Sequence, residues 1–210
     1  MLSLPIIQQC AAVALLATAA VLILGPHRAA RPTGPVKIVA RNPPARGTHT
    51  LWILGTLVAV FWPIGVFLAP AYAYHWPATP DGPGLWGLQV FGMVLGASGG
   101  VLFVAAARAL GNQMTPVIRV QEGHRLLQAG PYRYIRHPVY TAIVGVAIGQ
   151  TLVYLSPVLA VLTVLLAVLA TYRARLEEAM LSSPEGFGAT YRSYIARTGR
   201  FLPRLRRPSA

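Results

Sequence analysis

Acidic residues are scarce in this sequence. Its 210 residues include 5 Asp and Glu against 18 Lys and Arg, which gives a formal net charge of +13. Charged residues make up only 11% of the chain, against about 25% in ordinary soluble domains. This excludes an intrinsically disordered chain, because such chains are polar and highly charged. Cysteine is scarcer still: Cys10 is the only one, so a disulfide-stapled scaffold is excluded as well.

Apolar residues are abundant instead. They make up 55% of the chain, and the mean hydropathy is +0.55. A soluble globule of this size has too little interior to bury so much apolar surface. A basic soluble protein would suggest nucleic acid as a partner, whereas a basic and apolar chain favours a membrane protein with charged loops. We therefore expect membrane lipid, and no nucleic acid, among its partners.

Long charge-free runs predict the membrane-spanning helices. Such a helix needs roughly 20 apolar residues to cross about 30 Å of hydrocarbon, and residues 4–24, 51–70 and 85–107 each supply a run of that kind. Residues 139–172 are also free of charge, but 34 residues are too many for one crossing. Ser156-Pro157 near the middle predicts a tight hairpin of two short helices, at about 139–155 and 157–172.

The basic residues alternate between loops. They fall between the first two spans, between spans three and four, and after span five: Arg28, Arg31, Lys37, Arg41 and Arg46; Arg108, Arg119, Arg125, Arg133 and Arg136; and eight from Arg173 to Arg207. By the positive-inside rule this predicts five spans, with the N-terminus outside and the C-terminus in the cytoplasm. Because 17 of the 18 basic residues are Arg, a bias typical of GC-rich bacterial genomes, we expect a bacterial inner membrane.

Glycines recur every four residues in the third span, at Gly92, Gly96 and Gly100, and again at Gly145 and Gly149. A dinucleotide-binding glycine loop would require a preceding strand, and none is predicted. These glycines are instead expected to form small-residue faces on which neighbouring helices approach closely.

The sequence offers few catalytic motifs. None of the five histidines belongs to a close metal-ligand pair, so we expect no metal site. A Gly-x-Ser-x-Gly nucleophile elbow is absent, and Cys10 has no nearby base, which leaves covalent catalysis without support.

One dense polar segment precedes the hairpin. Gly130-Pro131 predicts a turn, and Pro138 is suited to the first turn of a helix, with His137 just before it. This would bring His137 and Tyr140 to a helix N-terminus, which attracts anions. Two interpretations remain open at this point: a ligand site, or arginines that set topology with tyrosines that anchor the membrane interface.

A second polar cluster follows the hairpin, where Arg173 and Glu177 stand four residues apart on one helical face and Glu178 is adjacent. Both ends of a hairpin meet at one membrane face, so Glu177 can approach His137 and Tyr140. A simple surface ion pair is the alternative. Farther on, residues 187–195 have the spacing of a basic amphipathic helix at the cytoplasmic interface.

In combination, these motifs resemble the isoprenylcysteine carboxyl methyltransferase and phospholipid methyltransferase families of integral membrane enzymes. The resemblance covers about residues 108–204 and rests on Leu110-Gly111, His124-Arg-Leu-Leu, Gly130-Pro-Tyr-Arg, Arg136-His-Pro-x-Tyr140, Glu177-Glu178, Phe187-Gly-x-x-Tyr-x-x-Tyr194 and Arg200-Phe-Leu-Pro203. Membrane sterol reductases that use NADPH look similar at the Arg-His-Pro-x-Tyr motif, so an NADPH-dependent reductase is the alternative. The Glu-Glu pair favours a methyltransferase.

The resemblance implies an all-α integral membrane enzyme that transfers a methyl group from S-adenosylmethionine to a lipophilic acceptor, either an isoprenylcysteine-like carboxylate or a lipid headgroup. It places Arg173 near the acceptor, and His137 is the nearest proton acceptor for an amine acceptor. By motif position it also implies the cofactor contacts Gln121, His124, Arg125, Leu126, Leu127, Tyr132, His137, Pro138, Val139, Tyr140 and Glu177. We expect one membrane domain, 1–210, with three spans in 1–107 and the cofactor-binding half in 108–210. The oligomeric state is left open.

Overall fold

The computed structural model describes residues 38–41, 45–69, 84–111, 119–121 and 126–204, together with Ser3, Ile6, Ile7, Gln9, Cys10, Val13, Ala14 and Gly82. The side chains of 38–41, 45, 46, 59, 60 and 119–121 are outside this description. Its elements are β1 (Ile38–Arg41), α2 (Ala45–Leu68), α4 (Leu85–Leu110), β2 (Arg119–Gln121), the 3₁₀ turn η3 (Gly130–Arg133), α5 (Pro138–Tyr154), α6 (Pro157–Leu181) and α7 (Gly188–Arg197).

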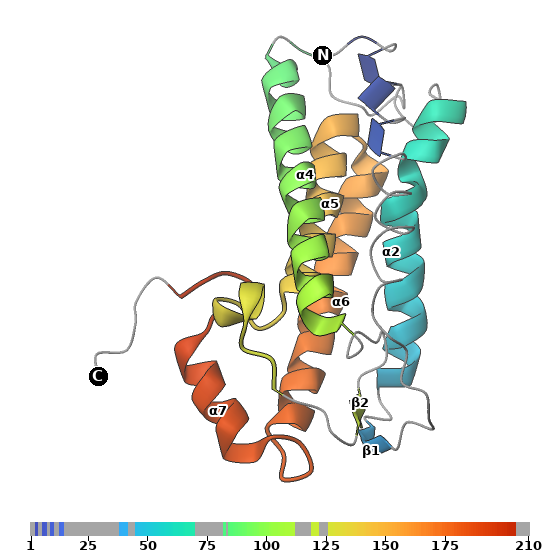
Figure 1. Ribbon diagram of the computed structural model, residues 1–210. Coiled ribbons are helices and arrows are strands. Elements are labelled where there is room, and N and C mark those ends of the chain that lie inside the picture. The colour runs from blue at the N-terminus through green and yellow to red at the C-terminus, as the bar shows by residue number, and fades with distance from the viewer. Residues whose placement is uncertain are drawn as a thin grey trace.

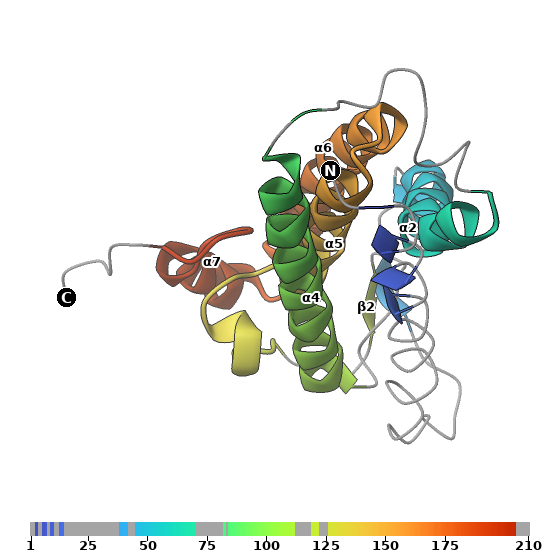
Figure 2. The same ribbon diagram turned by 90° about the horizontal axis from the view of Figure 1, so that it is seen from above.

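Four helices form an elongated bundle in which α4 packs on α5, and α6 lies between α5 and α2 (Figures 1 and 2). α2, α4 and α6 are each long and apolar enough to cross a membrane, and α5 is a shorter apolar helix. Large apolar side chains remain exposed along the bundle, among them Phe67, Phe91, Val101 and Val161. Exposure on this scale is typical of a surface that contacts lipid. The chain is a multi-pass membrane protein, as predicted, although most of the expected first span, 4–24, lies outside the described residues.

The predicted hairpin is present between α5 and α6. Leu155 adopts a left-handed conformation with φ 48°, and Ser156 caps α6 by accepting a hydrogen bond from the Leu159 backbone N–H at 3.3 Å. Pro157 then occupies the first turn of α6, where its missing N–H has no helical partner to lose. α6 continues well past the predicted end at residue 172, and this extension holds Arg173, Glu177 and Glu178 on one rigid helix.

Glycines do form the contact between α4 and α5, as expected. A Cβ added at Gly149 would lie 2.6 Å from the Gly96 backbone nitrogen, and one at Gly92 would lie 2.7 Å from the Gly149 carbonyl oxygen. The prediction was wrong for Gly100, where an added Cβ meets no described atom within 4 Å, and Gly99 faces α5 instead. The reason is helical geometry: at 3.6 residues per turn, a face that follows a four-residue spacing drifts, and a three-residue step restores it.

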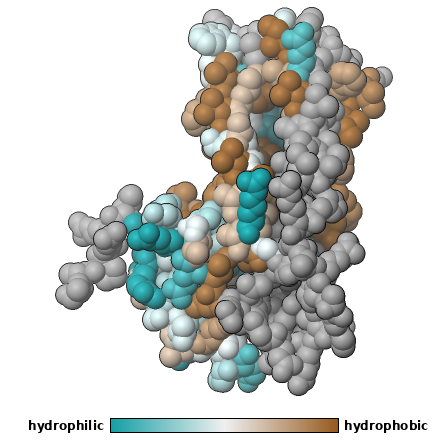
Figure 3. Space-filling view, viewed as in Figure 1, coloured by the Kyte–Doolittle hydropathy of each residue, from teal (hydrophilic) through white to brown (hydrophobic). Residues whose placement is uncertain are grey.

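One end of the bundle carries the polar structure. α7 lies beside this end, and strands β1 and β2 pair antiparallel near the start of α2 (Figure 1). This small sheet was not predicted, since both segments read as loops. In Figure 3 the hydrophilic surface gathers around α7, whereas the bundle is mainly apolar. The apolar face of α7, with Tyr191 and Tyr194, is buried against the protein; contact of α7 with a membrane interface stays a prediction.

Candidate active site

The start of α5 is tied to the chain that follows α7. The Arg136 N–H donates to the Gly199 carbonyl at 2.9 Å, and the His137 N–H donates to the Arg200 carbonyl at 3.1 Å. His137 is the N-cap of α5, with Pro138 in the first turn as the sequence predicts. Residues 199–200 therefore form a strap, which fixes the backbone from which His137 projects.

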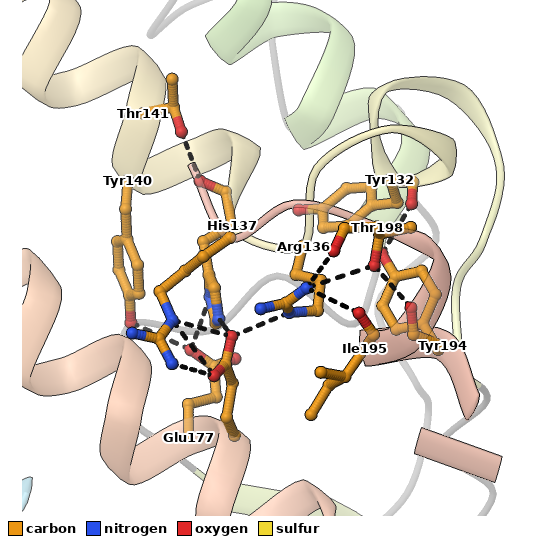
Figure 4. Close-up of polar contacts among 11 residues, drawn as sticks. Tyr132, Arg136, His137, Tyr140, Thr141, Glu177, Tyr194, Ile195 and Thr198 are labelled. Atoms are coloured by element: carbon orange, nitrogen blue, oxygen red, sulfur yellow. Dashed lines mark hydrogen bonds and ion pairs between the residues drawn. The ribbon is translucent and has the colours of Figure 1, made fainter. Parts of the chain in front are cut away.

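Glu178 lies at the centre of an ionic cluster next to this strap. Figure 4 shows two members of the cluster, Arg136 and His137. Its carboxylate accepts from Arg136 Nε at 2.8 Å, from Arg200 Nη2 at 2.6 Å and Nε at 3.1 Å, and it lies 3.2 Å from His137 Nε2. The Glu178 side chain is only 8% exposed, and a buried carboxylate of this kind requires paired donors. The hydrogen bond to Glu178 raises the pKa of Arg200. Glu178 is therefore a structural carboxylate.

α7 completes the support of Arg136. Arg136 Nη1 donates to the backbone carbonyls of Thr198 and Ile195. The Tyr194 hydroxyl donates to the Tyr132 carbonyl at 2.6 Å, and burial raises the pKa of Tyr194 to about 12. The tail helix thus holds both η3 and the residue before His137 in place.

Glu177 differs from Glu178 in being accessible. Its carboxylate accepts from the Tyr140 hydroxyl at 3.1 Å and lies 3.6 Å from His137 Nδ1, yet its side chain remains 31% exposed. The His137 and Tyr140 rings stack with centroids 5.4 Å apart. Burial, and next the charge of Glu177, raise the pKa of the Tyr132 hydroxyl. One reachable carboxylate therefore lies beside the stacked rings of His137 and Tyr140.

Arg173 precedes Glu177 by one helical turn and is only 1% exposed. Its Nη1 donates to Thr48 Oγ1 of α2 at 3.2 Å, and its guanidinium lies 5.8 Å from the centre of the Trp52 ring. Arg173 also interacts with the Tyr140 side chain. The expectation that Arg173 and Glu177 share a face near Tyr140 is thus confirmed.

The structure brings most of the predicted site residues to the start of α5: Tyr132, His137, Pro138, Val139, Tyr140, Arg173 and Glu177. Leu126 and Leu127 are half-buried and precede η3. His124 and Arg125 lie outside the described residues, as does the side chain of Gln121, whose backbone forms the end of β2. The binding roles of all these residues stay predictions.

Sequence reasoning missed two sets of residues. Glu178 and Arg200 were noted only as parts of motifs. Their opposite charges could have linked them, because the protein has only 5 acidic residues and a buried one needs a basic partner. Thr48 and Trp52 carried no signal, because they belong to an apolar span without a motif. In the described part of the chain, no group of three or more His, Cys, Asp or Glu residues is placed to hold a metal ion.

Part of the chain is similar to known proteins. Residues 91–183 match the model of the isoprenylcysteine carboxyl methyltransferase family. Over 121 residues the chain is 30% identical to proteins of Oryza sativa subspecies indica and japonica named "Probable protein-S-isoprenylcysteine O-methyltransferase", and the match covers 56% of this chain and 62% of theirs.

A solved structure shares the fold. The eukaryotic intramembrane Ras methyltransferase ICMT superimposes with a TM-score of 0.53 at 22% identity, over 75% of this chain and 53% of that one. The family match contains the start of α5 and the Arg173–Glu178 segment of α6. On these grounds residues 91–183 are similar to the isoprenylcysteine carboxyl methyltransferase family, and the chain shares the fold of a solved member.

Proposed function

We propose that this protein transfers a methyl group from S-adenosylmethionine to a carboxylate on a lipophilic acceptor, such as an isoprenylated cysteine. One observation carries the proposal. Arg173 and Glu177 stand one turn apart on α6, and the Tyr140 hydroxyl interacts with both. A buried guanidinium suited to a carboxylate thus lies beside an accessible carboxylate suited to a cationic ligand.

The residues present fit S-adenosylmethionine. Its sulfonium supplies an activated methyl group, and a cation of this kind is attracted to aromatic faces and to carboxylates. The stacked rings of His137 and Tyr140, with Glu177 beside them, offer both. Glu177 oxygens can also accept from ribose hydroxyls. Tyr132, Pro138 and Val139 would complete this surface, and the resemblance adds Leu126, Leu127, Gln121, His124 and Arg125.

Methylation of a carboxylate requires alignment more than acid–base catalysis. An acceptor oxygen forms a bond to the methyl carbon while the sulfur–methyl bond breaks and its electron pair stays on sulfur, so no proton moves. Arg173 would hold the acceptor carboxylate, and its burial keeps water away. His137 has a carboxylate near each ring nitrogen, an arrangement that suits orientation of Glu177 better than proton abstraction. An amine acceptor would instead need His137 as a base.

The lipophilic nature of the acceptor can be tested by chain length. The site lies at the end of an apolar bundle, where an acceptor can enter from the bilayer. Each buried methylene contributes about 0.8 kcal/mol of partitioning, so transfer of a tritiated methyl group to S-alkylated and S-prenylated cysteines should rise steeply with chain length. Methyl transfer that does not change with chain length would contradict the proposal that the acceptor is lipophilic. Titration of the purified protein with S-adenosylmethionine and with NADPH separates the methyltransferase from a reductase.

We further propose that the site faces the cytoplasm of a bacterial inner membrane, with the N-terminus outside. In the described part of the chain, Arg133, Arg136 and Arg175 lie at the site end of the bundle together with the arginines of α7, whereas Trp86 lies at the opposite end of α4. By the positive-inside rule, the concentration of arginines at the site end supports a cytoplasmic location for that end. A reporter fused after Ala210 should be active only in the cytoplasm; activity outside the membrane would reverse the topology.

A further inference from the structure

Trp52 of α2 contacts both sides of the proposed site. Its ring lies edge-on to Tyr140, with centroids 4.8 Å apart and planes at 72°, and the Arg173 guanidinium lies 5.8 Å from its centre. Trp52 is 5% exposed. One rigid indole therefore connects the ring beside the proposed cofactor surface to the cation proposed to hold the acceptor.

Thr48 adds a second contact from the same helix. It precedes Trp52 by one turn, so both side chains point to one face, and its hydroxyl accepts from Arg173 Nη1 at 3.2 Å. A long arginine side chain has many rotamers, and ordering it costs conformational entropy. The hydroxyl and the indole face together restrict the guanidinium to one orientation.

We propose that Trp52 and Thr48 are positioning residues that set the location of the acceptor carboxylate relative to the methyl donor. The inference rests on the proposed function, because it takes Arg173 as the group that binds the acceptor. α2 lies outside residues 91–183, the part that matches the family. The polar groups of α5 and α6 are thus aligned by a helix that the family match does not contain.

Loss of Trp52 should affect binding of the acceptor more than binding of the cofactor. The Arg173 guanidinium lies over the Trp52 ring, and the Trp52 and Tyr140 rings meet edge to face, whereas Glu177 lies near His137 as well as Tyr140. Loss of the indole should therefore displace the acceptor and leave cofactor binding nearly intact. A residue that served only core packing would affect both, through a general loss of structure.

The experiment uses the full-length protein in detergent, with Trp52→Phe, Trp52→Leu and Thr48→Val. Trp62→Phe is the matched control, because Trp62 packs with Val66 and Tyr154 in a different cluster. Calorimetry gives the affinity for S-adenosylmethionine, and methyl transfer to an S-farnesylated cysteine derivative gives kcat and the acceptor KM. For Trp52→Leu we expect the acceptor KM to rise about 10-fold, the scale set by loss of a desolvated cation–π contact, with cofactor affinity within about twofold. Trp52→Phe and Thr48→Val should give smaller increases in the same parameter.

A fluorescence measurement tests the position of the acceptor without turnover. In the triple variant Trp62→Phe, Trp76→Phe, Trp86→Phe, Trp52 is the remaining tryptophan. Titration with the S-farnesylated cysteine acid should change its emission, whereas the corresponding methyl ester, which lacks the carboxylate, should change it much less. Equal responses to acid and ester, or equal losses of cofactor and acceptor binding in Trp52→Phe, would overturn the inference while leaving the methyltransferase intact. If the wild-type protein binds S-adenosylmethionine but methylates no prenylated acid, the proposed function itself fails.

Discussion

Helix α5 is held in place by two different kinds of contact, one along its length and one at its first residue. Along its length, α5 is held by α4 through glycines that let the two backbones meet, as Gly149 and Gly96 do. At its first residue, α5 is held by charge, because Glu178 and Arg200 hold the strap against His137. The glycine contact depends on shape and van der Waals packing, and the ionic cluster depends on complete pairing of buried charge.

These two devices together can hold the start of α5, where the proposed site lies, in a fixed position. The glycine contact sets the position of α5 in the bundle, and the ionic cluster sets the direction in which His137 and Tyr140 leave its first turn. Each device has a characteristic weakness: the glycine contact does not tolerate added volume, and the ionic cluster does not tolerate a missing charge.

The largest effect is expected when the ionic cluster loses its acid. Glu178→Gln leaves Arg136 and Arg200 facing a neutral amide in a site that is largely buried. Removal of one partner of a buried pair costs about 3–5 kcal/mol, so the free energy of unfolding in detergent micelles should fall by about that much. Glu185→Gln is the matched control, since Glu185 is exposed and its loss should cost less than about 0.5 kcal/mol. Equal stability of the two variants would show that the cluster contributes no net energy.

A smaller loss is expected when volume is added to the glycine contact. In Gly149→Ala the new methyl group would lie 2.6 Å from the Gly96 nitrogen, a backbone atom that cannot rotate away. Overpacking of this kind costs about 1–3 kcal/mol. Gly100 lies on the same helix as Gly96 but outside the contact, so Gly100→Ala has open space for the new methyl group and should be neutral or gain up to about 1 kcal/mol from helix propensity. Thermal unfolding of both variants measures the difference, and a destabilised Gly100→Ala would contradict this assignment of faces.

The smallest effect on stability is expected at Glu177, where binding should change instead. Glu177→Gln alters a side chain that is 31% exposed, so unfolding should shift by less than about 0.5 kcal/mol. Affinity for S-adenosylmethionine should fall by roughly 1–3 kcal/mol, or about 5- to 150-fold, through loss of a charged partner. Calorimetry would compare it with Glu178→Gln under conditions in which both variants are folded. Weaker binding by Glu178→Gln than by Glu177→Gln would reverse the two roles.

Much of the fold and part of the candidate site could be predicted from the sequence. The charge-free runs predict the spans, and Ser156-Pro157 predicts the turn between α5 and α6, because span length and turn chemistry depend on residues adjacent in the chain. The motifs identified His137, Tyr140 and Glu177 as neighbours, since a hairpin brings its two ends to one face.

Other features depend on contacts between distant segments. Glu177 and Glu178 are adjacent and chemically identical, and only the return of residues 199–200 to the start of α5 buries one and leaves the other reachable. The rotation of α4 against α5 likewise selects Gly99 over Gly100. Thr48 and Trp52 reach Arg173 because α2 packs on α6. The sequence by itself determined the helices and the chemical groups, because these follow from local composition. Only the tertiary structure decided which groups are buried, paired or open, because those properties arise from packing between residues far apart in the chain.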